Sequence, residues 1–189
     1  YHEAGHASVS WLLEHANPLV KVTIVPRGQA LGAAWYLPEE RQITTKAQLL
    51  DQMISLLGGR ASEEIVFGEV STGALNDLER VTKQAYAMVV YYGLDKEIGN
   101  ISFYDSSGQS EYGFQKPFSD KTAEKIDAQI RTMVEEAYSK AKAILTENRE
   151  KLDALATILV EREVIFREDV ENIYGKRPWD EEKAEEQQA

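Results

Sequence analysis

The chain has 189 residues, with 21 Lys and Arg against 32 Asp and Glu, so its net charge is −11. This acidic balance argues against a nucleic-acid-binding protein, which needs basic patches to replace the counterions around phosphates, and against adsorption to an anionic membrane surface. A hydrophobic fraction of 43 % with 28 % charged residues is typical of a globular protein with one good core or two small ones.

The chain contains no cysteine, which excludes a disulfide scaffold and any thiolate metal site. A bound metal must therefore use histidine and carboxylate ligands. No run of eighteen apolar residues occurs, so this segment is not expected to span a membrane. The first residue, Tyr1, already precedes a helical pattern without a capping residue, and we expect an excised fragment of a longer protein.

The first elements along the chain are a short helix and two short strands. We expect the opening helix to reach about Glu14 or His15, because the residue before Pro18 is disfavoured in helical conformation. The β-branched run 20–25 and the shorter run 33–37 are predicted to form a small β ribbon.

Several helices follow the ribbon. Thr45 to Gln48 fits a capping box that opens a helix, which we expect Gly58 and Gly59 to interrupt before a second helical segment over residues 60–67. A further helix is predicted over residues 74–92, whereas residues 95–118 are predicted to form a long loop.

The last third of the chain is helical. Ser119 is predicted to open a long helix that breaks near Asn148, so that a helical hairpin covers about residues 119–162. A short helix is expected over residues 168–174. The fold class is therefore mainly α, a single domain over residues 1–178 with a small β ribbon and a C-terminal helical hairpin, followed by an acidic and disordered tail over residues 179–189.

The motif with the clearest chemistry is His2-Glu3-Ala4-Gly5-His6, an H-E-x-x-H pattern within the opening helix. Residues four apart lie on the same helix face, so both imidazoles can bind one metal ion. Glu3 lies about a hundred degrees around the helix, beside the metal, where a carboxylate can act as a general base. The alternative interpretation is a histidine pair that hydrogen-bonds core carbonyls, with Glu3 in solvent.

A catalytic zinc ion needs a third protein ligand and one open position for water. Val9 and Leu12 replace the Gly and His of the metzincin extension, which excludes that class. His15 lies three helical turns from the first ligand and cannot reach the same metal. The third ligand must therefore be a carboxylate, and the candidates on predicted helices are Glu63, Glu64 and Asp77. Spacing alone does not decide between them.

Several blocks of the sequence resemble the protease domain of the FtsH family of membrane-anchored, ATP-dependent zinc proteases. They cover the first half of the chain densely and in order. The matching stretches are residues 1–7, 25–28, 30–32, 37–40, 56–61, 63–64, 67–69, 71–74, 76–78 and 92–94.

The resemblance implies that His2, His6 and Asp77 bind Zn2+, that Glu3 is the catalytic base and that Glu64 orients a ligand histidine. It further implies polypeptide substrates, a homohexameric parent protein anchored in a membrane with this domain on its cytoplasmic side, and ATP used only by an ATPase module. The chain contains neither the phosphate-binding loop of such a module nor a spanning helix.

A different class of function remains open at this stage. The chain could be a helical assembly module that retains the motif without activity, since the hairpin at 119–162 has an apolar stripe. For the protease interpretation, residues 30–37 are a candidate edge strand that could hold an extended substrate.

Overall fold

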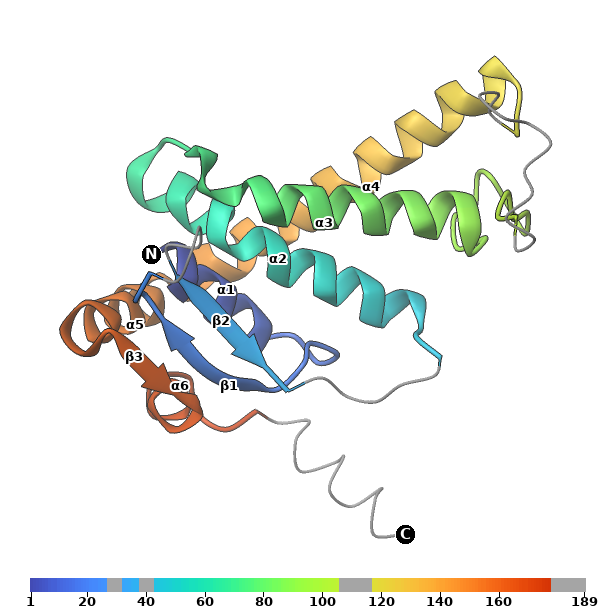
Figure 1. Cartoon of the computed structure of the whole chain (residues 1–189). Helices are drawn as coiled ribbons and strands as arrows, with labels where there is room; N and C mark the ends of the chain where they lie inside the picture. Colours follow the sequence, from blue (N-terminus) through green and yellow to red (C-terminus); the bar gives the residue numbers. More distant parts are fainter. Residues whose placement is uncertain (27–31, 38–42, 106–116, 178–189) are drawn as a thin grey trace, which may run out of the picture.

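The computed structural model describes residues 1–26, 32–37, 43–105 and 117–177. Within these residues helices predominate, and a small antiparallel sheet lies to one side of them (Figure 1), so the mainly α prediction is confirmed. The elements are α1 His2–Trp11, β1 Leu19–Thr23, β2 Ala33–Tyr36, α2 Lys46–Phe67, the 3₁₀ helix η1 Thr72–Ala74, α3 Leu75–Tyr86, the π-helical η2 Ala87–Tyr91, α4 Asp120–Glu147, α5 Arg149–Arg162, β3 Val164–Phe166 and α6 Arg167–Tyr174.

The opening helix α1 is the centre of the fold, since it contacts α2, α4, α5, α6 and the first two strands. It ends at Trp11, earlier than the expected Glu14 or His15. The reason lies in a neighbouring helix, because the backbone N–H of His15 donates to the carboxylate of Asp51 on α2 at 3.1 Å. A buried side chain thus replaces the helical carbonyl as the acceptor for this N–H group.

Helix α2 is continuous through Gly58 and Gly59, so the predicted interruption is wrong. Packing against α1 explains the difference, because a Cβ added to Gly5 would lie 2.3 Å from the carbonyl oxygen of Gly58. The two backbones approach closely only where side chains are absent, and this tertiary contact outweighs the low helix propensity of glycine. The predicted capping box at Thr45 and Gln48 is confirmed.

The predicted ribbon is confirmed as β1 paired antiparallel with β2, and the sheet has a third strand that was not predicted. Strand β3 pairs with the other side of β1, giving the order β2-β1-β3. It has only three residues, which is too short for a period-two pattern to identify it. In this sheet β2 is therefore an edge strand.

The remaining predictions divide between confirmed elements and residues outside the described part. The expected helix at 74–92 occurs as η1, α3 and η2, and Ser119 caps α4 by accepting from the N–H of Thr122. The break at Asn148 separates α4 from α5. The two helices have few contacts with each other, because α4 packs mainly on α2 and α5 on α1 and α6. The predicted hairpin at 119–162 is therefore two consecutive helices that pack mainly on different neighbours. Within the predicted loop, residues 95–105 contain no helix or strand, whereas residues 106–116 lie outside the described residues. The predicted tail, residues 179–189, also lies outside them.

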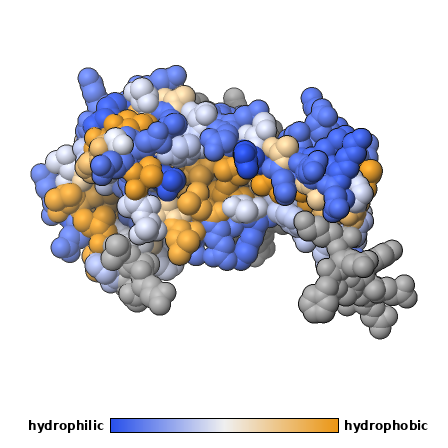
Figure 2. Space-filling model, turned by 90° about the horizontal axis from the view of Figure 1, so that it is seen from above, coloured by the Kyte–Doolittle hydropathy of each residue, from blue (hydrophilic) through white to orange (hydrophobic). Residues whose placement is uncertain are grey.

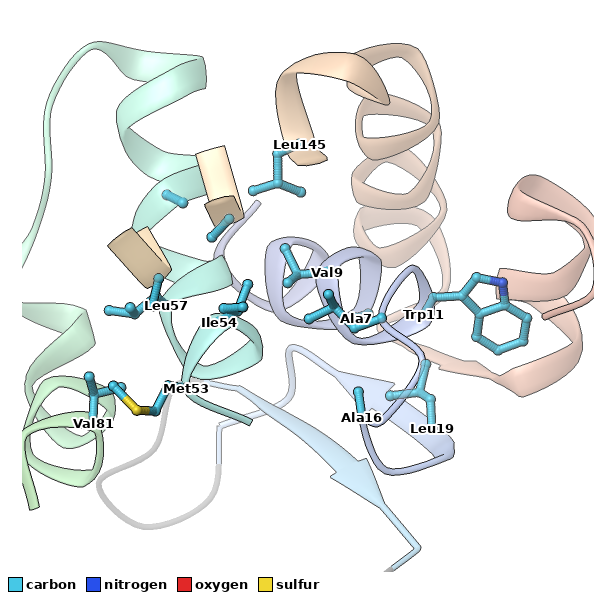
Figure 3. Packing of buried hydrophobic residues seen from close by; sticks show 14 of the residues in the cluster. Ala7, Val9, Trp11, Ala16, Leu19, Met53, Ile54, Leu57, Val81 and Leu145 are labelled. Atoms are coloured by element: carbon cyan, nitrogen blue, oxygen red, sulfur yellow. The ribbon is translucent and has the colours of Figure 1, made fainter. Parts of the chain in front are cut away.

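One hydrophobic core joins these layers. Figure 3 shows Ala7 and Val9 of α1 between Ile54 and Leu57 of α2 and the segment that carries Leu19, while the Trp11 ring points away from α2. Each of these side chains is at most 5 % exposed. The core thus fixes α1 and α2 rigidly against each other, and both helices carry residues of the site described below.

The described surface carries both hydrophilic and apolar side chains. Figure 2 shows one face, on which hydrophilic side chains cover one end of the molecule and apolar ones reach the surface nearer its middle. No helix within the described ranges is long and apolar enough to cross a membrane.

Candidate metal centre

Two histidine rings of α1 meet at the surface of the core. His2 and His6 are four residues apart, and their Nε2 atoms lie 3.1 Å from each other. His6 is 8 % exposed, and His2 is partly buried. The helical spacing alone accounts for this approach, as the sequence predicted.

A carboxylate completes a triangle with the two rings. Asp77, in the first turn of α3, places Oδ2 at 3.4 Å from Nε2 of His2 and at 3.4 Å from Nε2 of His6. The three residues form a group whose ligand atoms all lie within 4.8 Å of one another. Of the three carboxylates that the sequence left open, Asp77 is the one that faces both Nε2 atoms.

The other nitrogen of each ring determines its tautomer. Nδ1 of His2 lies 2.8 Å from Oε1 of Glu63, and Nδ1 of His6 lies 2.9 Å from the carbonyl oxygen of Ser55. A carboxylate and a carbonyl only accept, so both Nδ1 atoms carry the proton in neutral rings. Both Nε2 atoms therefore present lone pairs to each other and to the Asp77 carboxylate. Three converging lone-pair atoms require a cation between them, either a metal ion or an added proton.

The electrostatics of the cluster agree with this demand for positive charge. Burial opposes a charged His2, but its hydrogen bonds to Asp77 and Glu63 prevail and raise the pKa of the ring. Burial likewise opposes the charged form of Asp77, yet hydrogen bonds from His2 and His6 hold the pKa of this carboxyl well below its usual range. The site thus keeps a carboxylate and attracts positive charge.

The distances fit a tetrahedral zinc ion. Zn–N and Zn–O bonds of roughly 2.0–2.1 Å at tetrahedral angles separate neighbouring ligand atoms by roughly 3.3 Å. The observed separations are 3.1, 3.4 and 3.4 Å. Gly59 of α2 leaves this space open, because a Cβ there would lie 2.5 Å from Nε2 of His6 and 2.6 Å from Nε2 of His2.

Glu3 lies beside the cluster. It is partly buried, and burial raises the pKa of its carboxyl. A Cβ added to Gly32 would lie 2.7 Å from Oε1 of Glu3, so the start of β2 closes over this side chain. A raised pKa lies closer to neutral pH, where a carboxylate can both accept and donate a proton during a reaction.

A groove of about 1240 Å³ contains all of these groups. Strand β2 forms one wall, and α2 with the start of α3 forms the other; lining residues include His2, Glu3, His6, Glu63 and Asp77. Tyr36 at the end of β2 also lines the groove, and burial raises the pKa of its phenol to about 12. The groove is thus bordered by an edge strand of the sheet.

The structure corrects the prediction for Glu64. Glu63, not Glu64, accepts the hydrogen bond from His2, whereas Glu64 accepts one from the hydroxyl of Tyr138 and pairs with Lys142 at 3.1 Å. Consecutive helical residues point about a hundred degrees apart, so only one of the two can face α1. The sequence held a usable signal, because Glu63 lies four residues after Gly59 and therefore on the same helix face.

Two further residues were not identified from the sequence. Gly59 was interpreted as a helix interruption, and Ser71 received no role, although its N–H donates to Oε2 of Glu63 at 3.0 Å. His15 is not among the residues that line the groove.

The chain is similar in sequence to known proteins. Residues 1–173 match the model of peptidase family M41. The chain is 65 % identical over 178 residues to an ATP-dependent zinc metalloprotease FtsH of Parabacteroides distasonis, covering 94 % of this chain and 26 % of that protein. It is 48 % identical over 181 residues to a mitochondrial inner membrane m-AAA protease component of Mus musculus, covering 96 % of this chain and 22 % of that protein. The chain thus spans about a quarter of the length of these relatives.

Proposed function

The chain belongs to peptidase family M41, and from this premise we propose that it is a zinc-dependent endopeptidase domain acting on unfolded polypeptides. The observation that carries the proposal is the triangle of His2, His6 and Asp77, whose ligand atoms are separated as a tetrahedral zinc site requires. These three residues would hold the ion. When bound, zinc supplies Lewis acidity, which polarises a peptide carbonyl and lowers the pKa of water.

The protein's own groups provide the remaining chemistry. Glu3 takes a proton from the attacking water and later delivers it to the departing amide nitrogen. Burial supports this role, because it raises the pKa of Glu3 and brings the carboxyl closer to the range in which it can both accept and donate. Glu63 and the carbonyl of Ser55 hold the two imidazoles in the tautomer that leaves Nε2 free for the metal.

Substrate binding is proposed at the edge of the sheet. Strand β2 pairs with β1 on one side, and its residues 33–36 line the groove next to Glu3. An extended peptide added beside β2 would present its backbone to the site with little dependence on side chains. In a longer parent protein, as the names of the relatives suggest, an ATP-driven module would deliver such extended chains.

Glu3→Gln tests the proposal. The zinc ligands survive this change, so we expect one zinc ion per chain by elemental analysis and no hydrolysis of an unfolded polypeptide. Glu64→Gln is the matched control, because Glu64 contacts Tyr138 and Lys142 and does not contact the cluster; it should retain both zinc and hydrolysis.

The possible outcomes separate the two classes of function. Equal hydrolysis by parent and Glu3→Gln would refute Glu3 as the base. A parent chain that binds no zinc and keeps the histidine pair packed would favour the alternative of a silent assembly module.

A further inference from the structure

The carboxylate of Glu63 is held from two sides. On one side Oε1 accepts from Nδ1 of His2 at 2.8 Å. On the other, Ser71 donates its backbone N–H to Oε2 at 3.0 Å, and its hydroxyl lies 3.0 Å from Oε2 and 3.2 Å from Oε1. The Glu63 side chain is only 13 % exposed although Ser71 itself is exposed. Ser71 therefore covers the carboxylate at the point where water would otherwise compete for it.

Ser71 also begins the segment that carries the third ligand. Its hydroxyl accepts from the N–H of Gly73 at 3.1 Å and so caps η1. Helix η1 leads directly into α3, whose first turn holds Asp77. One hydroxyl thus contacts both the partner of His2 and the turn that leads to Asp77.

The chain path explains why this residue can reach both. Helix α2 ends at Phe67 and is capped by Gly68, which has a left-handed φ of 72°. The chain turns back there, so that Ser71 lies against Glu63, eight residues earlier in the last turns of α2. Any residue except proline could donate its backbone N–H at position 71, but a side-chain hydroxyl is needed to donate to Glu63 and accept from Gly73 together.

We propose that Ser71 is a positioning residue of the metal centre, which holds the Glu63 carboxylate against His2 and thereby fixes the ring for metal binding. The inference rests on the proposed zinc site. A ligand histidine is oriented by the acceptor on its other nitrogen, and that acceptor is effective only while its own orientation is fixed. Ser71 acts through Glu63 and does not touch the metal or the substrate.

Zinc affinity of the whole 189-residue chain, measured by competition with a chromophoric chelator, tests the proposal. Ser71→Ala removes the hydroxyl and should weaken zinc binding about fivefold, on the order of the net contribution of one typical hydrogen bond. Ser71→Thr keeps the hydroxyl and should restore the parent affinity within about twofold. The visible absorption of the cobalt-substituted protein should change in Ser71→Ala and not in Ser71→Thr, because these bands report ligand geometry.

Two controls separate positioning from general stability. Ser119→Ala removes the equivalent hydroxyl cap from α4, far from the site in sequence, and should leave zinc affinity unchanged. In a double-mutant cycle, adding Ser71→Ala to Glu63→Gln should cause no further loss, since the hydroxyl acts through the carboxylate.

Zinc binding by the parent chain tests the proposed zinc site, and zinc binding by Ser71→Ala tests the positioning role of Ser71. If the parent binds one zinc ion and Ser71→Ala binds it equally well, or if the two substitutions are fully additive, the positioning role is overturned and the zinc site stands. A parent that binds no zinc would overturn both.

Discussion

Gly59→Ala gives a sharp test of the metal centre, because it adds one methyl group at its floor. The new Cβ would lie 2.5 Å from Nε2 of His6 and 2.6 Å from Nε2 of His2, whereas ordinary contacts begin at 3.4 Å. The rings would have to retreat by about 0.8–0.9 Å, and metal sites tolerate deviations of only about 0.2 Å in ligand distance. We expect zinc affinity to fall by at least about 100-fold, the upper end of the cost of losing a ligand-orienting partner.

Chelator competition measures this loss, and thermal unfolding of the metal-free chain measures the cost to the fold. Alanine is a better helix former than glycine by about 1 kcal/mol, which partly offsets the strain in the metal-free protein. Gly58→Ala is the matched control on the same helix. Its Cβ would lie 2.7 Å from the carbonyl oxygen of Gly5, so it should lower the melting temperature by disturbing the contact between α1 and α2.

The test compares the zinc affinity and the melting temperature of the two glycine variants. Gly59→Ala should mainly lower the zinc affinity, whereas Gly58→Ala should mainly lower the melting temperature. A Gly59→Ala chain that binds zinc within about threefold of the parent would show that the two Nε2 atoms are not the ligands, and the geometric argument for the site would fail.

Three further results are expected. Glu63→Gln should weaken zinc binding about 10- to 100-fold, and Asp77→Asn should weaken it more, because Asp77 faces both Nε2 atoms whereas Glu63 only orients one ring. The opposite ranking in a metal analysis would show that Asp77 is not the third ligand. Gly32→Ala, whose Cβ would lie 2.7 Å from Oε1 of Glu3, should keep zinc and lower kcat about tenfold; loss of metal instead would contradict this assignment. Thr45→Ala removes the cap of α2 and should lower the free energy of unfolding, measured by urea titration, by about 1 kcal/mol. An unchanged free energy of unfolding would contradict a stabilising role of the capping box.

Local rules predicted much of the helical structure. The capping residues Thr45 and Ser119 start α2 and α4 as expected, and Gly68 ends α2 in the left-handed conformation. These features depend on hydrogen bonds and backbone preferences within a few residues. The sequence failed where a distant element intervened, as at Gly58, where the backbone of α1 makes glycine favourable inside a helix.

The candidate site divides in the same way. The approach of His2 to His6 follows from one helical turn, so the motif alone predicts it. The position of Asp77 depends on how α3 packs against α2 and α1, and the choice of Glu63 over Glu64 depends on which face of α2 meets α1. Spacing does not give the position of Asp77, because it depends on rotations between helices that the core side chains fix. Spacing does place Glu63 on the same face of α2 as Gly59, but only the packing of the helices shows that this face meets the histidines.

The sequence by itself determined the chemistry available to this protein. An acidic, cysteine-free chain with one H-E-x-x-H motif leaves a histidine and carboxylate metal site and excludes thiolates. Spacing left three carboxylates open and the family resemblance pointed to Asp77; the tertiary structure shows that Asp77 approaches both histidines and that Glu63, not Glu64, orients His2. The physical reason is that helical periodicity acts over one turn, whereas the convergence of α1, α2 and α3 depends on burying a shared core that no single segment can form alone.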